Sequence, residues 1–403
     1  MPVNRRTFLL SGLGAAVAST SSPVRAAAAD DDWVGRRKDD LPTPALLLDL
    51  DAFEFNLKTM ADHCRRSGCG FRPHAKTHKC VEVGKRQVAS GALGVSTATV
   101  PEAEAMVAGG IRGVLLTSPV VDAGKIARMV NLVRNGGEVM LSVGHPRQAE
   151  MLARAAEAAH VKVDVLVDVD VGDRRSGILP GAPAQDLAVQ MAKSGNLRVR
   201  GVQAYSGMSS HTVGFEKRQQ VSRQAMTKAV ETRDLLTKAG LDAPIVSGGS
   251  TGTYNIDSTI PGVTELQVGS YVFMDVDYRR IGGKSGAVYT DFKPSLTVLT
   301  TVVSATHSDR VSLDAGTKAF ATDVPYKPEA RDWPGIVYAR AGDEFGSLTA
   351  EGGGKLPRLG DRLEFIVPHC DPTVNLYDRL YAVRGDRVEA VWPISARRET
   401  SKG

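Results

Sequence analysis

Five basic side chains fall within nine residues near the start of the chain, in the segment 71–79 with the sequence FRPHAKTHK. They are an arginine, two histidines and two lysines, namely Arg72, His74, Lys76, His78 and Lys79. Positive neighbours disfavour the protonated form of an amine, so a lysine here is expected to keep more of its neutral, nucleophilic form. That is the state a Schiff-base lysine needs. Taken alone, such a segment is more often a solvated basic loop.

Two turns rich in glycine and hydroxyl side chains could hold an anion. The first is residues 248–254, GGSTGTY, and the second is residues 269–271, GSY. Glycine lets the backbone approach a ligand closely, and serine and threonine hydroxyls donate hydrogen bonds to anions. One such turn is usually an ordinary loop, but two at the same edge of a domain favour a phosphate site. The residues expected to hold the phosphate are Ser250, Thr251, Gly252, Thr253, Gly269, Ser270 and Tyr271.

Three further candidates follow strand-like segments in the middle of the chain. Arg175 lies in residues 168–177, DVDVGDRRSG, and could face the phenolic oxygen of a cofactor, although a solvated arginine in an ordinary turn fits equally well. Tyr205 ends the next strand-like segment and is either a site residue or part of the core. His211 follows it, and a lone histidine of this kind is more often a surface or core residue.

A possible metal site lies near the end of the chain, in residues 368–375, PHCDPTVN. In an extended strand, His369 and Asp371 would project to one side and Cys370 to the other, because side chains alternate. A nitrogen and a carboxylate oxygen then reach one ion. The oxygen ligand favours Mn²⁺, with Mg²⁺ or Zn²⁺ as alternatives. A His-x-Asp pair without other support is usually a solvated turn.

These residues are positioned by a regular alternation of strand-like and helix-like segments. The predicted strands span residues 70–76, 94–99, 113–118, 138–143, 161–170, 198–206, 244–250 and 264–273. The predicted helices span residues 79–91, 101–110, 122–135, 147–159, 183–194 and 215–240, with a short one near 254–259. Eight such strands predict an α/β fold, a closed (β/α)8 barrel of the TIM type, with its active site at the carboxyl ends of the strands.

The placement of Lys76 across the barrel mouth from the two glycine-rich turns describes a pyridoxal phosphate site, in which a lysine holds the cofactor's aldehyde. From about Leu296 the chain changes to short β-branched runs separated by Gly, Pro and Asp, which predicts an all-β domain. We assign residues 42–290 to the pyridoxal phosphate-binding barrel. Residues 291–396 form the β domain with the metal pair.

Composition narrows the classes of partner. The 403 residues carry a net charge of +5, and no basic run is interleaved with aromatic residues, so nucleic-acid binding is not expected. The four cysteines show no CxxC pair, which argues against a zinc knuckle or a disulfide framework.

The first residues predict export. Arg5 and Arg6 precede a short apolar run rich in Gly and Ala, and small residues end it near Ala27. This pattern is typical of a twin-arginine signal peptide, here residues 1–29, and predicts a periplasmic protein that does not stay in the membrane. The apolar run is too short for a transmembrane helix.

In combination, these motifs resemble the fold-type III pyridoxal phosphate enzymes that share the alanine racemase barrel, and within them the D-threonine aldolase and D-serine dehydratase group. The resemblance runs from about Leu41 to about Ile394. It implies that Lys76 is the Schiff-base lysine, that Arg175 faces the cofactor and that the two turns grip its phosphate. His74 and Tyr205 complete the expected cofactor contacts.

The resemblance also implies a reaction. His369 and Asp371 match the metal motif of the aldolases, whereas eukaryotic D-serine dehydratases typically carry Cys at the second position. His211 matches a histidine that the aldolases place near the substrate's β-hydroxyl. We therefore expect metal-dependent retro-aldol cleavage of D-threonine and related D-3-hydroxy-amino acids to glycine and an aldehyde, with Lys76 and His211 as catalytic residues, in a homodimer.

Two alternatives remain open at this stage. The same residues could support β-elimination of water from D-serine or 3-hydroxyaspartate. A protein of another class, which binds pyridoxal phosphate or a sugar phosphate without catalysis, would also need the phosphate turns.

Overall fold

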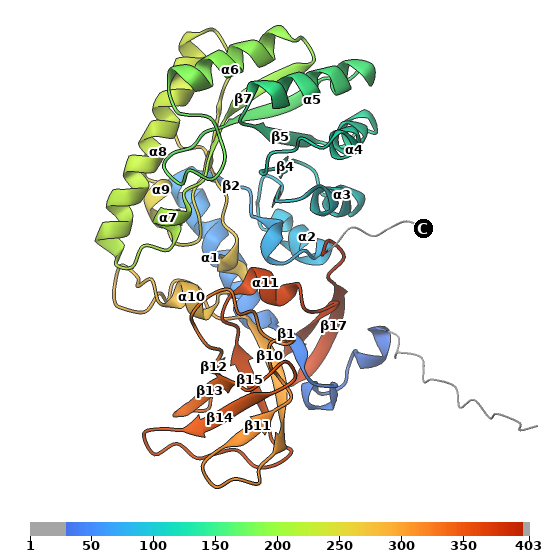
Figure 1. Ribbon diagram of the computed structural model, residues 1–403, viewed down its shortest axis with the longest axis vertical. Coiled ribbons are helices and arrows are strands. Elements are labelled where there is room, and N and C mark those ends of the chain that lie inside the picture. Colours follow the sequence, from blue (N-terminus) through green and yellow to red (C-terminus); the bar gives the residue numbers. More distant parts are fainter. Residues whose placement is uncertain (1–29, 398–403) are drawn as a thin grey trace, which may run out of the picture.

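The structure is a computed structural model that describes residues 30–397. The predicted signal peptide, residues 1–29, lies outside the described residues. Figure 1 shows a barrel of strands wrapped by helices in the upper half of the molecule and a β domain in the lower half. Among the described residues, no helix is long and apolar enough to cross a membrane.

The barrel contains the eight parallel strands that the alternation predicts, in the order β2-β9-β8-β7-β6-β5-β4-β3. A backbone bridge between His74 and Ser96 closes the ring, with Ser96 N donating to Pro73 O at 2.8 Å. The strands are β2 (Gly70–Phe71), β3 (Ser96–Thr97), β4 (Val114–Leu116), β5 (Val139–Val143), β6 (Val163–Asp168), β7 (Leu197–Ala204), β8 (Ile245–Gly248) and β9 (Glu265–Leu266). The predicted barrel fold is confirmed.

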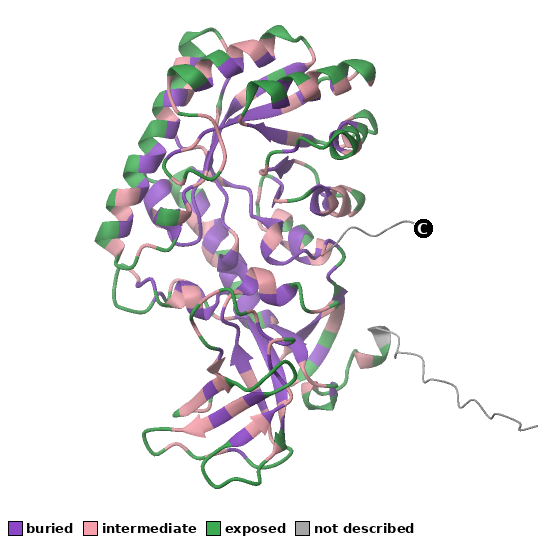
Figure 2. Ribbon diagram, in the orientation of Figure 1, coloured by how far each residue is buried: buried purple, intermediate pink, exposed green. Residues whose placement is uncertain are grey.

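The predicted helices also form, and they cover the outside of the barrel (Figure 1). They are α2 (Val81–Ala89), α3 (Val100–Ala108), α4 (Ala123–Arg134), α5 (Pro146–Ala158), α6 (Ala182–Lys193), α8 (Phe215–Lys238) and the short α9 (Tyr254–Asp257), and a further helix, α1 (Leu50–Ser67), precedes them. In α4, Ile126, Met129 and Val130 face the strands at helical spacing, and the side chain of Asp122 caps the helix by accepting from Lys125 N at 2.8 Å. Figure 2 shows the resulting pattern of buried inner and exposed outer helix faces.

The second sheet has nine strands in the order β11-β14-β13-β12-β15-β10-β1-β16-β17, and β11 also pairs with β10. Its strands are β1 (Ala45–Asp49), β10 (Leu296–Ser304), β11 (Val311–Leu313), β12 (Glu329–Ala330), β13 (Ile336–Arg340), β14 (Gly346–Ala350), β15 (Arg362–Ile366), β16 (Arg379–Arg384) and β17 (Arg387–Pro393). The strands β12 and β14 were not predicted. One is two residues long, and the other has the weakly patterned sequence GSLTA.

The strand β1 belongs to this second sheet, although its residues fall inside the range 42–290 that we assigned to the barrel. It pairs antiparallel with β10 and parallel with β16. Leu46 and Leu48 face the main core, while Leu47 and Ala45 pack in a smaller cluster on the other side of the sheet. An apolar run with both faces covered suits the interior of a sheet, and it joins the two halves of the molecule.

A buried ion pair braces the barrel from inside. Arg72, just after β2, donates from Nε and Nη2 to the two carboxylate oxygens of Glu265 on β9, both at 2.9 Å. Its Nη1 donates to the carbonyl oxygens of Leu93 and Gly113, which precede β3 and β4. Both charged side chains are less than a tenth exposed. The pair therefore ties four neighbouring strands of the ring together.

We predict that Glu265→Gln lowers the free energy of unfolding by about 3–5 kcal/mol, because it leaves the Arg72 charge buried without its partner. The matched control is Glu138→Gln, which breaks the Arg112–Glu138 pair on the surface, where the two side chains are 80% and 51% exposed. An exposed pair contributes about 0–1 kcal/mol. Urea unfolding followed by circular dichroism measures both variants. Equal losses would show that the buried pair has no special role.

Candidate active site

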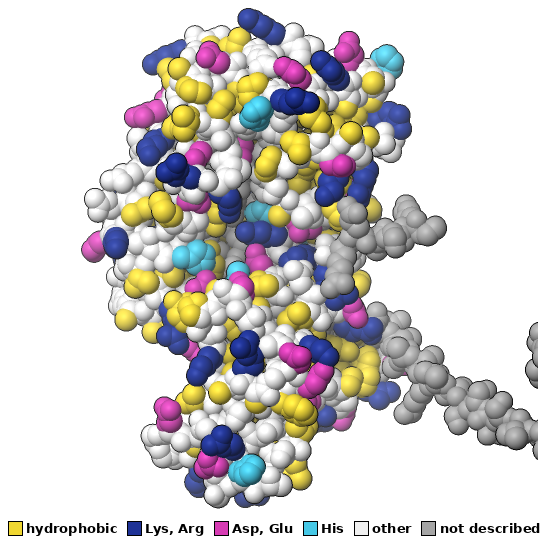
Figure 3. All heavy atoms as spheres, in the orientation of Figure 1, with side chains coloured by type: hydrophobic (Ala, Val, Ile, Leu, Met, Phe, Trp, Pro, Cys, Tyr) yellow, Lys and Arg dark blue, Asp and Glu magenta, His cyan; other side chains and the backbone are white. Residues whose placement is uncertain are grey.

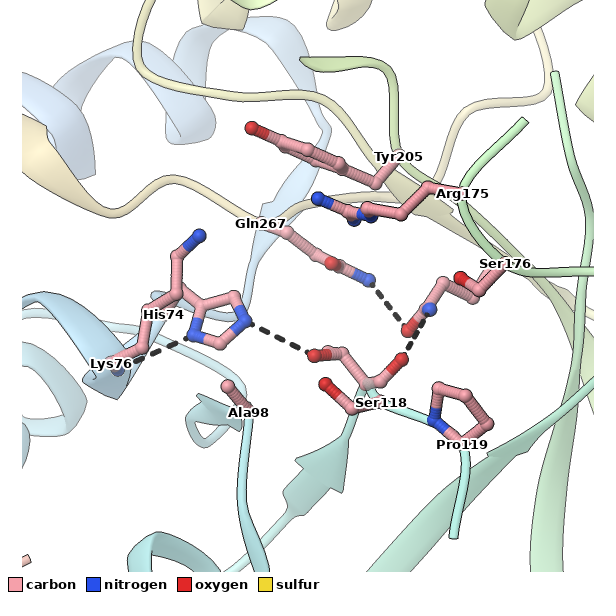
Figure 4. A pocket seen from close by; sticks show the side chains of 11 residues that line it. His74, Lys76, Ala98, Ser118, Pro119, Arg175, Ser176, Tyr205 and Gln267 are labelled. Carbon is pink, nitrogen blue, oxygen red and sulfur yellow. Dashed lines mark hydrogen bonds between the residues drawn. The ribbon is translucent and has the colours of Figure 1, made fainter. Parts of the chain in front are cut away.

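Lys76 lies at the mouth of the barrel, directly after β2. It is the middle residue of a short 3-10 turn, Ala75–Thr77, and its backbone N–H donates to His74 Nδ1 at 3.3 Å. Figure 4 shows its side chain beside His74, with Arg175 and Tyr205 facing it across the cavity. The cavity measures about 420 Å³, within the usual size range of small-molecule sites. Its lining residues are His74, Lys76, Ala98, Thr117, Ser118, Pro119, Arg175, Ser176, Gln203, Tyr205 and Gln267.

A second cavity of about 200 Å³ adjoins the first and shares His74, Lys76, Tyr205 and Gln267 with it. The other residues that line it are Thr77, His211, Ser250, Gly269, Ser270, Tyr278, His369 and Asp371. Lys76 therefore lies where the two cavities meet. Figure 3 shows a hollow in this middle part of the molecule, between the barrel and the β domain, with basic, acidic and histidine side chains at its rim.

The expectation that its four basic neighbours surround Lys76 with positive charge is wrong. Arg72 is paired with Glu265 inside the barrel. Burial, with a smaller effect of Lys76, holds the pKa of His74 well below its ordinary value, and burial lowers the pKa of His78 to about 3. Both imidazoles are therefore neutral near pH 7.

The charges that do face Lys76 have opposite signs. Lys76 Nζ lies 3.7 Å from Asp371 Oδ2. Lys79 is buried, and its Nζ donates to the carbonyl oxygens of Lys76 and Asp371. Burial lowers the pKa of Lys79. Burial would raise the pKa of Asp371, but the positive charges of Lys76, Lys79 and His369 outweigh it and lower that pKa.

The two glycine-rich turns lie against each other beside Lys76. Ser250, Gly269 and Ser270 line the smaller cavity, as the phosphate prediction requires. Gly269 packs so closely on the residue after Lys76 that a Cβ atom there would come within 2.7 Å of Thr77 Oγ1. Thr251 Oγ1 accepts from Tyr271 N at 2.9 Å and so joins the two turns.

Three other residues predicted to hold the phosphate have different partners. Thr253 Oγ1 accepts from Ser250 N at 3.1 Å and donates to Asp257. The side chain of Tyr271 is fully buried, and its hydroxyl accepts from Gln87 Nε2 at 3.3 Å. Gly252 is anchored through its backbone, because its carbonyl oxygen accepts a hydrogen bond from the buried Arg218 side chain. These residues shape the turns, and their side chains do not line the cavities.

Arg175 and Tyr205 form the far wall of the larger cavity (Figure 4). The Arg175 guanidinium lies 5.0 Å from the centroid of the Tyr205 ring, and Lys76 Nζ lies 5.7 Å from it. Gln203, which the sequence analysis did not single out, lies deeper in the barrel. Its Nε2 donates to Asp168 Oδ1 at 3.0 Å and to Thr117 O at 2.9 Å. The sequence signal that could have identified Gln203 is a polar residue at an inward-facing position of a barrel strand, as occurs on β7 and β9. Such positions are usually apolar.

The extended geometry predicted for residues 369–371 is wrong. His369 precedes a short helix, α11 (Cys370–Val374), and Asp371 lies in its first turn, so the side chains do not alternate as they do in a strand. Proline and threonine after Asp371 suit the start of a helix, and the alternation rule does not apply there. His369 Nδ1 is nevertheless bonded to Asp323 Oδ2 at 2.6 Å, and both His369 and Asp371 line the cavity with Lys76.

A short helix, α10 (Val276–Arg279), links the two sides of this cavity. The buried Asp275 carboxylate accepts from Tyr278 N and from Cys370 N, each at 2.9 Å, and so caps both α10 and α11. Asp277 Oδ2 lies 3.0 Å from His211 Nδ1. The helix therefore holds the predicted base from the barrel and the predicted metal pair from the β domain in one fixed arrangement.

Several atoms around the cavities fit a cofactor and a metal. Among the described residues, the buried atoms without a hydrogen-bond partner include Thr77 Oγ1 and Asp371 Oδ1, and both residues line the smaller cavity. The His369 bond to Asp323 uses Nδ1, so its Nε2 is the atom available to a metal. Residues 30–397 contain no cluster of three or more His, Cys, Asp and Glu side chains that would hold a metal by themselves.

Comparison with known proteins supports one family. Residues 48–277 match the alanine racemase N-terminal domain, and residues 295–383 match a serine dehydratase domain. The chain is 39% identical to a D-threonine aldolase from an Arthrobacter species, over 88% of this chain and 92% of that one. It is 36% identical to a 3-hydroxy-D-aspartate aldolase of Paracoccus denitrificans, over 90% and 94% of the two chains. A crystal structure of D-threonine aldolase from Filomicrobium marinum aligns with a TM-score of 0.87 at 38% identity, over 90% and 98%.

The buried histidine beside Lys76 predicts a specific pH dependence. The pKa of His78 is about 3 in the folded chain and 6.5 ordinarily, so between these values the unfolded chain binds more protons. Stability therefore falls as the pH drops from about 6.5 toward 3, by up to about 1.4 kcal/mol per pH unit from this group. We expect His78→Gln to remove up to that amount from the slope of unfolding free energy against pH. Equal slopes in His78→Gln and the unaltered protein would contradict the assignment.

Proposed function

The chain belongs to the D-threonine aldolase and D-serine dehydratase group of proteins with the alanine racemase fold, and we propose from this that it is a carbon–carbon lyase that cleaves D-3-hydroxy-amino acids such as D-threonine to glycine and an aldehyde. The aldolases among its relatives, at 36–39% identity over most of both chains, support this reaction. Pyridoxal phosphate is the cofactor that the family implies. Dependence on a divalent metal, Mn²⁺ foremost, is part of the proposal.

One observation carries the proposal. Lys76 from the barrel and Asp371 from the β domain line the same cavity with 3.7 Å between Nζ and Oδ2. The lysine that holds the cofactor, to which the substrate's α-carbon end would be attached, must lie close to the group that acts on the β-hydroxyl, because the bond that breaks joins the α- and β-carbons. A distance of this size satisfies that requirement.

Each side chain has a task that follows from its position. Lys76 would hold the cofactor, whose phosphate would lie against Ser250, Gly269 and Ser270. When bound, pyridoxal phosphate supplies an electron sink for the carbanion left at the α-carbon. Arg175 and Tyr205 form the wall opposite Lys76 and restrict the ring to one orientation.

The β-hydroxyl would lie on the other side of Lys76. There His369 Nε2 and Asp371 Oδ1 would hold a divalent ion, which would polarise this hydroxyl. His211 Nδ1 lies 3.0 Å from Asp277 Oδ2, and its Nε2 would accept the hydroxyl proton. Loss of that proton and cleavage of the bond between the α- and β-carbons yield the aldehyde.

The dehydratase alternative uses the same cavity but a different product. Asp371 favours the aldolase reaction, because the family resemblance implies Cys at this position in the eukaryotic dehydratases. A keto acid and ammonia from D-serine would support elimination instead. Pairing as a homodimer and export to the periplasm remain predictions.

We predict that the purified protein, loaded with pyridoxal phosphate and Mn²⁺, forms acetaldehyde and glycine from D-threonine and not from L-threonine. Lys76→Ala should lower kcat/KM at least about 1,000-fold, because it removes the nucleophile. Borohydride treatment followed by peptide mass spectrometry should place the cofactor on Lys76. The exposed control Lys85→Ala should keep full activity. Label on another lysine, or activity that survives Lys76→Ala, would refute the assignment.

A separate prediction concerns the metal. Chelation with EDTA should reduce aldehyde formation at least about 100-fold while the cofactor's absorbance stays, and added Mn²⁺ should restore the activity. His369→Ala should have the same effect but without recovery on Mn²⁺ addition. The control His307→Ala changes an exposed histidine of the β domain and should remain dependent on Mn²⁺ like the unaltered protein. Full activity after thorough chelation would show that the reaction needs no metal.

A further inference from the structure

Arg218 is the largest fully buried side chain of the described residues, and it has no carboxylate partner in residues 30–397. It lies in the first turn of α8. Its guanidinium donates only to backbone carbonyl oxygens: Nε to Gly252 at 2.7 Å, Nη1 to Thr212 and Ile281, each at 2.9 Å, and Nη2 to Gly282 at 2.7 Å.

A buried positive charge of this kind is costly. Removing a cation from water costs several kcal/mol unless an opposite charge and hydrogen bonds compensate for it. Carbonyl dipoles satisfy the N–H groups of Arg218, and the more distant Asp291 carboxylate and the Phe215 and Tyr289 rings, 5.7 and 5.9 Å from its guanidinium, offset only part of its charge. Arg72, the other deeply buried arginine of the barrel, differs from Arg218, because Glu265 neutralises it through two hydrogen bonds.

The first glycine-rich turn connects Arg218 to the cavity. The carbonyl that Arg218 Nε contacts is that of Gly252, in the middle of the first glycine-rich turn. On the same turn, Ser250 lines the cavity, and its Oγ accepts from Gly252 N at 3.2 Å. The turn cannot move away from the arginine, because it packs against α7 (Gly207–Ser210): a Cβ atom at Gly252 would come within 2.2 Å of Ser210 O.

We propose that Arg218 is a positioning residue for the cofactor's phosphate. The positive charge of Arg218 would complement the negative charge of the phosphate across the Ser250–Thr253 turn. The inference rests on the proposed function in one respect, that pyridoxal phosphate is the cofactor. Arg218 does not touch the ligand. Its side chain lines neither cavity, so its charge would act through the turn from within the protein, where electrostatic attraction is stronger than in solvent. Its hydrogen bonds also fix Thr212, next to His211, and Gly282, after α10.

The test separates charge complementarity from a purely structural role by using two ligands. Pyridoxal has the ring and aldehyde of pyridoxal phosphate but lacks the phosphate. The apo-protein is titrated with each ligand, and Kd is obtained from the absorbance change on binding. Arg218→Met should weaken pyridoxal phosphate at least about 10-fold and change pyridoxal less than about 2-fold, because only the phosphate responds to the charge. Lys217→Met, the exposed neighbour with the same change of net charge, should alter neither Kd.

A second variant covers the case in which Arg218→Met fails to fold. Arg218→Lys keeps the charge and loses part of the carbonyl network, so we expect it to lose less than about 3-fold in affinity for pyridoxal phosphate. Circular dichroism of the apo-proteins shows whether each variant is folded. Equal weakening of both ligands, or a loss in Arg218→Lys as large as in Arg218→Met, would overturn the inference.

The same measurements distinguish a failure of the Arg218 assignment from a failure of the proposed function. If the unaltered protein binds pyridoxal phosphate and is an aldolase but Arg218→Met keeps its phosphate preference, only the role of Arg218 is refuted. If the unaltered protein binds neither ligand, the cofactor assignment itself is wrong, and this inference falls with it.

Discussion

The contact between the segment after β2 and the segment that begins α11 is the constraint on which the site depends. It brings the Lys76 amine of the barrel within 3.7 Å of the Asp371 carboxylate of the β domain. Neither domain contains both groups. The chemistry therefore requires that the relative position of the two domains be fixed to within about 0.5 Å.

Buried polar groups hold that relative position. The Lys79 ammonium donates to the carbonyl oxygens of Lys76 and Asp371, and its own carbonyl accepts from Ala396 N at 3.0 Å. Lys79 adopts a φ of 50°, a conformation that residues with a Cβ atom rarely take, so its surroundings must impose it. Asp275 adds a second link, because its carboxylate caps α10 and α11 together. Fully bonded polar groups of this kind specify one arrangement of the domains more narrowly than apolar contacts do.

The cavity itself is prepared by residues that do not line it. Asp257 fixes Thr253, Thr251 joins the two glycine-rich turns, and Arg218 anchors Gly252. Burial raises the pKa of Asp257 to about 6, although Ser222 and Thr253 donate hydrogen bonds to its carboxylate. The cost of these buried groups is consistent with a site whose ligand contributes to the stability of the loaded protein.

The sequence by itself determined the barrel and the change to a β domain, because these depend on periodicity, and it determined the position of Lys76 beside the glycine-rich turns, because the strands of such a barrel all end at one face. Only the tertiary structure decided that β1 joins the second sheet, that Glu265 neutralises Arg72 and that Tyr271 points into the core. Each of these involves a partner distant in sequence, and side-chain direction at such positions is set by packing. The helical turn at His369 belongs to the same group: an alternating pattern predicts side-chain directions only where the backbone is a strand, and the contact with Lys79 and Asp275 made it a helix instead.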